Sequence, residues 1–306
     1  MSVTPVRSCI TKARVPRCGW NAHAFRRAIL SFLICAGMTA VVNAQEPRWM
    51  IAGGAIKLFD SAGGSGTVFF AGPGNIIMSG MKGADGFPEG YRALPTAGFA
   101  SYAELKSALD NGKLPKEVKA VLYDNEAWEF TPPEEQHDIA KYEKLAAEAA
   151  HSHGLLFIAT PATDLTRILS PQVTSGHYDE YLRLGIAREA AQYADIYEIQ
   201  AQGSLGTLAL YTRFVKAAAA QARAANPKII VFAGLSTNPS GRLVTAKNLY
   251  DAVMATRGDV AGYWLNIPAG GARCPRCGEA KPEVAVELLK MLAPQSSNTQ
   301  KTSLHP

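Results

Sequence analysis

The sequence predicts an α/β fold, a TIM-like (β/α)8 barrel whose first units are abbreviated. Strand-like and helix-like segments alternate five times between about residues 101 and 293, and such alternation is typical of a parallel sheet covered by helices. The roughly 262 residues that follow Ala44 also suit a single barrel. Only about 50 of them precede residue 101, which is short for three full units, so an open doubly wound sheet is the alternative.

Residues 45–100 contain short apolar runs separated by glycine-rich turns. We predict strands over the three runs 49–51, 67–71 and 75–78, and no long amphipathic helix. The glycines between Ser61 and Gly66 precede a strand-like run, whereas a phosphate-binding loop should open a helix. We therefore interpret them as a turn.

From Ser101 onward the alternation is regular. Ser101 and Glu104 form a capping-box pattern, which predicts a helix that ends near Gly112. The polar tail 294–306 is predicted to be disordered. The remaining predicted elements are, in order, strand 120–126, helix 131–154, strand 155–159, helix 177–193, strand 195–202, helix 208–225, strand 229–233, helix 244–256, strand 260–267 and helix 282–292.

Residues 1–44 have the layout of a secretory signal peptide. Six Lys and Arg residues and no acid precede an apolar run at 28–42, and Val42-Asn43-Ala44 is an acceptable cleavage site. The apolar run is too short for a membrane span. We therefore expect a secreted or periplasmic protein, cleaved after Ala44, with no stable membrane insertion.

The predicted leader carries the positive charge of the chain. The whole sequence has 31 Lys and Arg against 26 Asp and Glu, and subtracting the six leader cations leaves 25 against 26. No basic stripe remains that would indicate a nucleic-acid partner.

Two cysteines, Cys274 and Cys277, lie outside the leader, in the sequence Cys-Pro-Arg-Cys. A closed zinc site needs four ligands, and no second pair or nearby histidine supplies them. In an oxidising compartment the pair predicts a small disulfide that fixes a loop. We expect neither a metal nor another cofactor.

An acidic cluster at the end of strand 120–126 is the strongest functional signal. Side chains alternate between the faces of a strand, so Asp124 and Glu126 share one face, and Trp128 follows. In a parallel barrel this point lies at the carboxyl-terminal rim, where active sites form.

The same reasoning brings polar residues from other strands to this rim. Helices cover the apolar outer face, so the polar residues of strands 195–202 and 260–267 should point into the barrel. Carboxylates, amides and aromatic rings together suit a sugar ligand. The further predicted site residues are Glu198, Gln200, Gln202, Trp264 and Asn266 from strands, with Asp164 and Asn238 from loops.

Over residues 120–268 the strand ends resemble those of the chitinase-type glycoside hydrolases, family eighteen, whose fourth strand ends in Asp-x-Glu. Asp124-Asn125-Glu126 is similar to that ending, and segments 156–162, 197–202, 229–236 and 262–265 are similar to strands five to eight. The resemblance implies a β/α barrel, Glu126 as general acid, Asp124 as the group that tunes its pKa, and Trp264 as the floor of the sugar site. Two further acids of the family pattern are replaced by Lys119 and Leu122, so it does not imply a substrate-assisted mechanism.

A second assignment of the catalytic residues does not depend on the family resemblance. Glu126 and Glu198 form an acid with a nucleophile or base, and the separation of the two carboxyls selects retention or inversion. The remaining residues named above, Trp128 included, are predicted to bind substrate.

Three functions follow from these residues. The first is an exported glycoside hydrolase acting on a poly- or oligosaccharide, and the second is a non-catalytic barrel that binds a glycan or a protein. The third is a metal-dependent hydrolase that uses Asp124, Glu126 and a distant histidine. A purely structural role, in which Asp124 and Glu126 bond loop amides or an arginine, is the remaining interpretation.

Overall fold

The computed structural model describes residues 46–81, 86–272 and 274–293. The chain divides into two units, Met1–Ala44 and Gln45–Pro306, and the described residues belong to the second. The predicted signal peptide, its cleavage site after Ala44 and the predicted disordered tail 294–306 lie outside the described residues. No helix in the described ranges has the length and apolar character that a membrane crossing requires.

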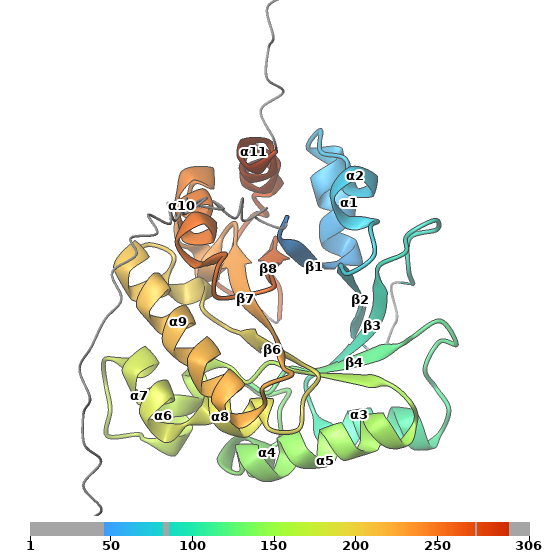
Figure 1. The fold of residues 1–306 in the computed structure, drawn as a ribbon, viewed down its shortest axis with the longest axis vertical. Coiled ribbons are helices and arrows are strands. Elements are labelled where there is room, and N and C mark those ends of the chain that lie inside the picture. The colour runs from blue at the N-terminus through green and yellow to red at the C-terminus, as the bar shows by residue number, and fades with distance from the viewer. Residues whose placement is uncertain (1–45, 82–85, 273, 294–306) are drawn as a thin grey trace, which may run out of the picture. The chain divides into compact units, whose positions relative to one another are not determined.

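The second unit is a closed barrel of eight parallel strands in sequence order (Figure 1). The barrel closes where β1 pairs with β8, with Met50 opposite Trp264. The predicted (β/α)8 fold is therefore confirmed, and the open doubly wound alternative is excluded. The strands are β1 (Arg48–Ala52), β2 (Ile76–Met81), β3 (Leu94–Phe99), β4 (Ala120–Tyr123), β5 (Leu156–Ala159), β6 (Ile196–Ile199), β7 (Ile230–Ser236) and β8 (Gly262–Asn266).

The helices lie outside the barrel (Figure 1). Two of them, α9 and α11, have the predicted bounds, and α10 begins two residues later than predicted. The α-helices are α1 (Gly53–Ser61), α2 (Gly66–Phe70), α3 (Tyr102–Asp110), α4 (Pro133–His137), α5 (Ile139–Ser152), α6 (Thr166–Leu169), α7 (His177–Leu184), α8 (Ile186–Ala191), α9 (Leu208–Ala225), α10 (Ala246–Thr256) and α11 (Pro282–Leu292).

The first units differ from the prediction. Residues 67–71 were predicted as a strand, but 67–70 belong to helix α2 and Ala71 is its C-cap, and the third strand is Leu94–Phe99 instead. The helix starts where the Gly66 amide donates to Asp60 Oδ1 at 2.6 Å. It buries Phe70 against Phe59, with ring centroids 5.2 Å apart, while Val68 remains exposed. The turn before it opens a helix of five residues, which is too short to argue for a phosphate site.

Two predicted helices are each divided by a local backbone break. Helix 131–154 becomes α4 and α5, because Asp138 leaves the helical conformation and caps the Lys141 amide at 3.2 Å. Helix 177–193 becomes α7 and α8 at Gly185, whose φ of 71° is left-handed and suits glycine.

The strands divide the core into two layers, as the alternation of side chains predicts. On β6, Ile196 belongs to the cluster inside the barrel, while Tyr197 and Ile199 belong to the cluster between strands and helices. The inner cluster is small and apolar, so it fills the barrel below its polar rim. It contains Met50, Ile76, Met78, Ala120, Leu122, Ile158, Ile196 and Phe232.

A buried carboxyl breaks the apolar character of the outer layer. Glu143 on α5 is fully buried, and neither of its oxygens has a hydrogen-bond partner among the described residues. Burial raises the pKa of Glu143 well above its ordinary value of 4.5. The folded chain therefore holds this proton more tightly than the unfolded chain does.

We predict that Glu143→Met makes stability less dependent on pH. A carboxyl whose pKa is raised by folding contributes its full stability below the unfolded pKa near 4.5 and loses it as pH rises toward the folded pKa. At pH 8 the free energy of unfolding of the variant should exceed that of the wild type by about 1–3 kcal/mol, because the variant no longer buries a carboxyl without a hydrogen-bond partner. Denaturant unfolding at several pH values measures both effects.

The matched control is Glu148→Met on the same helix, since Glu148 is exposed. Its stability profile should follow the wild type. A Glu143→Met profile parallel to the wild type would contradict the assignment.

Candidate active site

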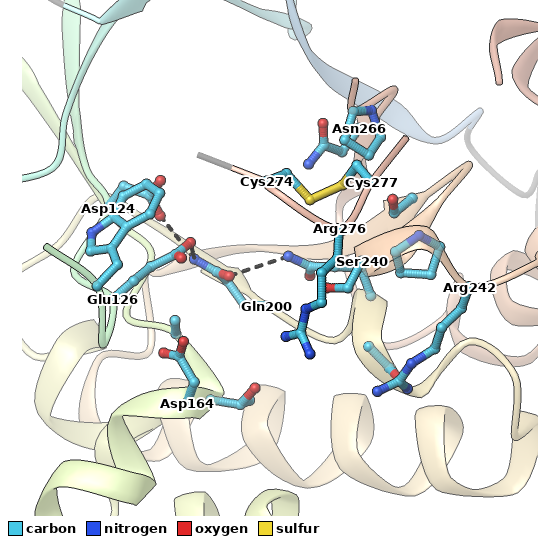
Figure 2. A pocket seen from close by; sticks show the side chains of 18 of the residues that line it. Asp124, Glu126, Asp164, Gln200, Ser240, Arg242, Asn266, Cys274, Arg276 and Cys277 are labelled. Atoms are coloured by element: carbon cyan, nitrogen blue, oxygen red, sulfur yellow. Dashed lines mark hydrogen bonds between the residues drawn. A yellow bond between two sulfur atoms is a disulfide. The ribbon is translucent and has the colours of Figure 1, made fainter. Parts of the chain in front are cut away.

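A cavity of about 810 Å³ lies at the carboxyl-terminal ends of the strands. Its walls come from loops that follow β4, β5, β6, β7 and β8, so the barrel brings together segments far apart in the sequence (Figure 2). The sequence-predicted residues that line it are Asp124, Glu126, Trp128, Asp164, Gln200, Gln202, Trp264 and Asn266.

The side-chain amide of Gln200 connects the acidic pair. Strand β4 ends at Tyr123, so Asp124 and Glu126 lie in the loop after it. Gln200 Nε2 lies 2.8 Å from Asp124 Oδ1, 3.2 Å from Glu126 Oε1 and 3.0 Å from the Thr160 carbonyl oxygen. Thr160 Oγ1 also donates to Asp124 Oδ1 at 3.1 Å. The ends of β4, β5 and β6 are therefore held together at one point.

Glu126 is the carboxyl with the altered acidity. Burial raises the pKa of Glu126 well above its ordinary value, and the nearby carboxyls of Asp124 and Asp164 raise it further. The hydrogen bond from Gln200 opposes this shift. Glu126 therefore keeps its proton to a higher pH than a solvated glutamate, as a general acid requires.

The loop that carries Glu126 is fixed by its own polar contacts. The Ala127 amide donates to Asp164 Oδ1 at 3.1 Å, which ties the β4 loop to the 3₁₀ turn Thr163–Leu165 after β5. Trp128 Nε1 donates to Thr131 Oγ1 at 2.8 Å, and that hydroxyl donates to the Ala100 carbonyl at 2.7 Å. The indole is thereby held on the cavity wall.

Glu198 lies in the barrel interior, away from the cavity wall. It is fully buried, does not line the cavity, and its two oxygens have no hydrogen-bond partner among the described residues. Burial, together with the charge of Asp124, raises the pKa of Glu198 well above its ordinary value. Glu198 lies within β6, one layer below the rim, whereas Gln200 follows Ile199, the last residue of that strand, and reaches the cavity. The structure does not support its predicted role as nucleophile or base.

Asn238 differs from its prediction too. Its side-chain amide donates to the Cys277 carbonyl and, at 3.0 Å, to the Glu279 carbonyl, and the residue does not line the cavity. Asn238 therefore joins the loop after β7 to the loop after β8 and is not placed to bind substrate.

The end of β8 supplies an aromatic ring and an amide. Trp264 packs against the inner core cluster and also lines the cavity. Asn266 lines the cavity too. The indole Nε1 of Trp264 has no hydrogen-bond partner among the described residues. This nitrogen is buried, so what Trp264 offers to the cavity is part of its aromatic ring, a surface that suits a sugar face.

A disulfide closes the loop after β8. Cys274 and Cys277 are bonded, with their Cα atoms 5.4 Å apart, and the loop turns through a hydrogen bond from the Cys277 amide to the Cys274 carbonyl at 3.1 Å. Both cysteines line the cavity. Among the described residues, no group of three or more His, Cys, Asp and Glu side chains could hold a metal ion.

Sequence reasoning missed the cations of the cavity. Arg167, Arg242 and Arg276 all line it, and each follows a barrel strand in the chain. Their positions in the sequence could have indicated this, because each arginine lies in a segment that follows a barrel strand and such segments form the rim.

Comparisons with known proteins agree with the barrel. Hydroxymethylglutaryl-CoA lyase from Pseudomonas aeruginosa is similar with a TM-score of 0.51 and 14% identity, over 81% of this chain and 86% of that chain. The fold is a TIM barrel. Such low identity shows the fold alone.

Other structures match less closely. Triosephosphate isomerase from Bartonella henselae has a TM-score of 0.40 and 12% identity, over 80% of this chain and 98% of that chain. A β-mannanase from Mytilus edulis has a TM-score of 0.30 and 14% identity, over 54% of this chain and 61% of that chain. No family model and no curated protein matches the chain, so the resemblance to the chitinase-type hydrolases stays a prediction.

We predict that Asp124→Asn lowers the pKa of Glu126. The substitution removes the neighbouring negative charge that disfavours ionisation of Glu126, so this carboxyl should lose its proton at a lower pH. Carboxyl ¹³C NMR titration measures the shift directly.

Asp179→Asn is the control, because Asp179 is exposed and pairs with Arg213 outside the cavity. It should leave the titration of Glu126 unchanged. An unchanged or raised pKa of Glu126 in Asp124→Asn would show that the two carboxyls are not coupled.

Proposed function

We propose that this protein is a glycoside hydrolase-like enzyme that cleaves a poly- or oligosaccharide by carboxylate acid/base catalysis. The observation that carries the proposal is the Asp124, Gln200 and Glu126 group, bonded together on the wall of a cavity that Trp128 and Trp264 also line. Acid groups for the glycosidic bond and rings for the sugar faces then share one space.

Glu126 is the proposed general acid. With its raised pKa it retains a proton that it donates to the leaving glycosidic oxygen. Asp124 is the charge that favours this protonated form and that stabilises positive charge developing on the sugar ring. Gln200 holds both carboxyls in place through one amide nitrogen.

The second carboxylate of the reaction is proposed to be Asp164. Asp164 lines the cavity and lies near enough to Glu126 to raise its pKa, whereas Glu198 does not line the cavity. Hydrolysis of a glycosidic bond requires a carboxylate that activates water or attacks the sugar. Asp164 Oδ1 also accepts a hydrogen bond from the Ala127 amide, which holds this carboxyl beside the loop that carries Glu126.

The position of the acidic pair supports the chitinase-type resemblance as part of this proposal. Asp124-Asn125-Glu126 follows the fourth strand of the barrel, where that family carries Asp-x-Glu. Lys119 and Leu122 stand where the family has its two upstream acids. The proposal therefore includes the acid and its neighbour but no substrate-assisted step.

A non-catalytic, glycan-binding barrel is the second candidate. It is favoured by the contacts of Asp124, whose Oδ1 accepts hydrogen bonds from Thr160 and Gln200 within the protein. Such contacts also serve to shape a binding wall. The two candidates differ in one measurable property, the release of product.

We expect Glu126→Gln to reduce kcat about 100- to 10,000-fold, because general acid catalysis contributes this much, with little change in KM. Release of reducing ends from a panel of poly- and oligosaccharides measures the rate, and circular dichroism checks the fold. In the wild type kcat/KM should fall as pH rises through the pKa of Glu126, since the protonated form is required.

Glu129→Gln is the matched control, because Glu129 is exposed in the same loop and does not line the cavity. It should retain wild-type activity. Normal turnover by Glu126→Gln would exclude Glu126 as the acid, and tight glycan binding by the wild type without any product would favour the binding barrel.

A further inference from the structure

The cavity has two walls of opposite charge. Asp124 and Glu126 lie on one side, and the guanidinium groups of Arg242 and Arg276 lie on the other, with Gln200 between them (Figure 2). A neutral glycan has no group that requires two arginines. The arginine wall is therefore the part of the cavity that the proposed function leaves unexplained.

We propose that Arg242 and Arg276 bind an oxyanion carried by the sugar chain, a carboxylate, sulfate or phosphate, so that the ligand is an acidic glycan. This inference rests on the proposed function, from which it takes a glycan as the ligand. It adds that the glycan carries an anionic group. Arg167 lines the same cavity and adds a third positive charge.

The two loops that carry these arginines are braced against each other. Asn238 donates from the β7 loop to the Cys277 and Glu279 carbonyls of the β8 loop. Gly241, with a φ of 77°, approaches the Arg276 carbonyl so closely that a Cβ there would overlap it. The backbones next to both guanidinium groups are thus fixed relative to each other before any ligand binds.

Each loop also holds its arginine in a constrained turn. Arg276 lies inside the disulfide-closed turn between Cys274 and Cys277. Arg242 lies two residues after Ser240, whose φ of 51° is rare outside glycine. Strain of this kind persists where the surrounding structure imposes it, and it is common at ligand sites.

The guanidinium groups keep donors for a ligand. Arg242 Nη1 donates to the Gly203 carbonyl at 2.8 Å, which orients the guanidinium group. Its other N–H groups form no hydrogen bond with another described residue. Arg276 forms no ion pair or side-chain hydrogen bond with any described residue. A planar guanidinium with free donors matches an oxyanion in a bidentate arrangement.

A phenol lies beside this wall. Tyr178 lines the cavity, and burial raises the pKa of its phenol, while a hydrogen bond with Ser204 and the nearby charge of Arg242 oppose the rise. The Tyr178 hydroxyl is therefore a neutral donor next to a cation. Together with Arg242 and Arg276 it suits an oxyanion with several acceptor oxygens.

The charge separation also fixes the direction of the ligand. The carboxylates of Asp124 and Asp164 repel an anionic substituent, while the arginines attract it, and both effects are stronger in a cavity than in open water. The anionic group is placed at the arginine wall and a neighbouring glycosidic bond near Glu126. A chain in the reverse direction loses both interactions.

The test compares matched ligands. Isothermal titration calorimetry on the Glu126→Gln variant, which cannot consume the ligand, measures affinity for oligogalacturonate and its methyl ester, and for a sulfated oligosaccharide and its desulfated counterpart. At least one anionic member should bind about tenfold or more tightly than its neutral partner, as charged hydrogen bonds provide. Its affinity should fall with added salt.

The arginines are tested by substitution in the same background. Arg276→Met and Arg242→Met should each reduce affinity for the anionic member about 10- to 100-fold and leave the neutral member unchanged. Arg276→Lys should retain part of the preference, since it keeps the charge without the planar fork. Arg257→Met is the control, because Arg257 is exposed at the end of α10 and does not line the cavity.

The outcomes separate this inference from the proposed function. Equal affinity for charged and neutral partners, or wild-type binding by both arginine variants with intact folds, would overturn the inference even if glycan hydrolysis is found. If inorganic sulfate or phosphate binds but none of the anionic oligosaccharides does, the inference is overturned as well. Retained anionic preference in a wild type that releases no product would support the inference and refute the hydrolytic step.

Discussion

The candidate site depends on the hydrogen bonds of one side-chain amide. Gln200 Nε2 lies within bonding distance of Asp124, Glu126 and the Thr160 carbonyl, so it connects the ends of three adjacent strands. Gln202 donates to the Gln200 oxygen at 3.2 Å and extends the same contact toward β7. A buried amide of this kind holds the two carboxyls close together, so that Asp124 raises the pKa of Glu126.

The barrel explains why such a group forms at all. Parallel strands in sequence order place all carboxyl-terminal ends on one rim, and the inner cluster beneath them is mostly apolar, with Thr96 and Glu198 among the buried polar residues of the strands. Polar residues that would be dispersed along the chain therefore meet in one cavity. The loops after β7 and β8 complete it by bracing each other through Asn238, and they carry the cations that oppose the acidic wall.

The fold was largely predictable because period and alternation are local signals. Helices α9 and α11 have the predicted bounds, and Tyr197 and Ile199 face the helices as the alternation along β6 requires. The errors have two causes: local backbone breaks at Asp138 and Gly185 divide two predicted helices, and packing between segments decides the first units. The run 67–71 has strand-like residues, yet Phe70 is buried against Phe59 only if the segment is helical.

The sequence by itself determined the alternation of strands and helices after residue 101, the inward face of strand β6 and the presence of Asp124 and Glu126 just after a strand. Only the tertiary structure decided which of these polar residues reach the cavity. Depth along a strand separates Gln200 from Glu198, and contacts between loops divert Asn238 and gather the arginines. The physical reason is range: alternation acts between neighbouring residues, whereas a cavity wall is made by segments that meet only after the barrel closes.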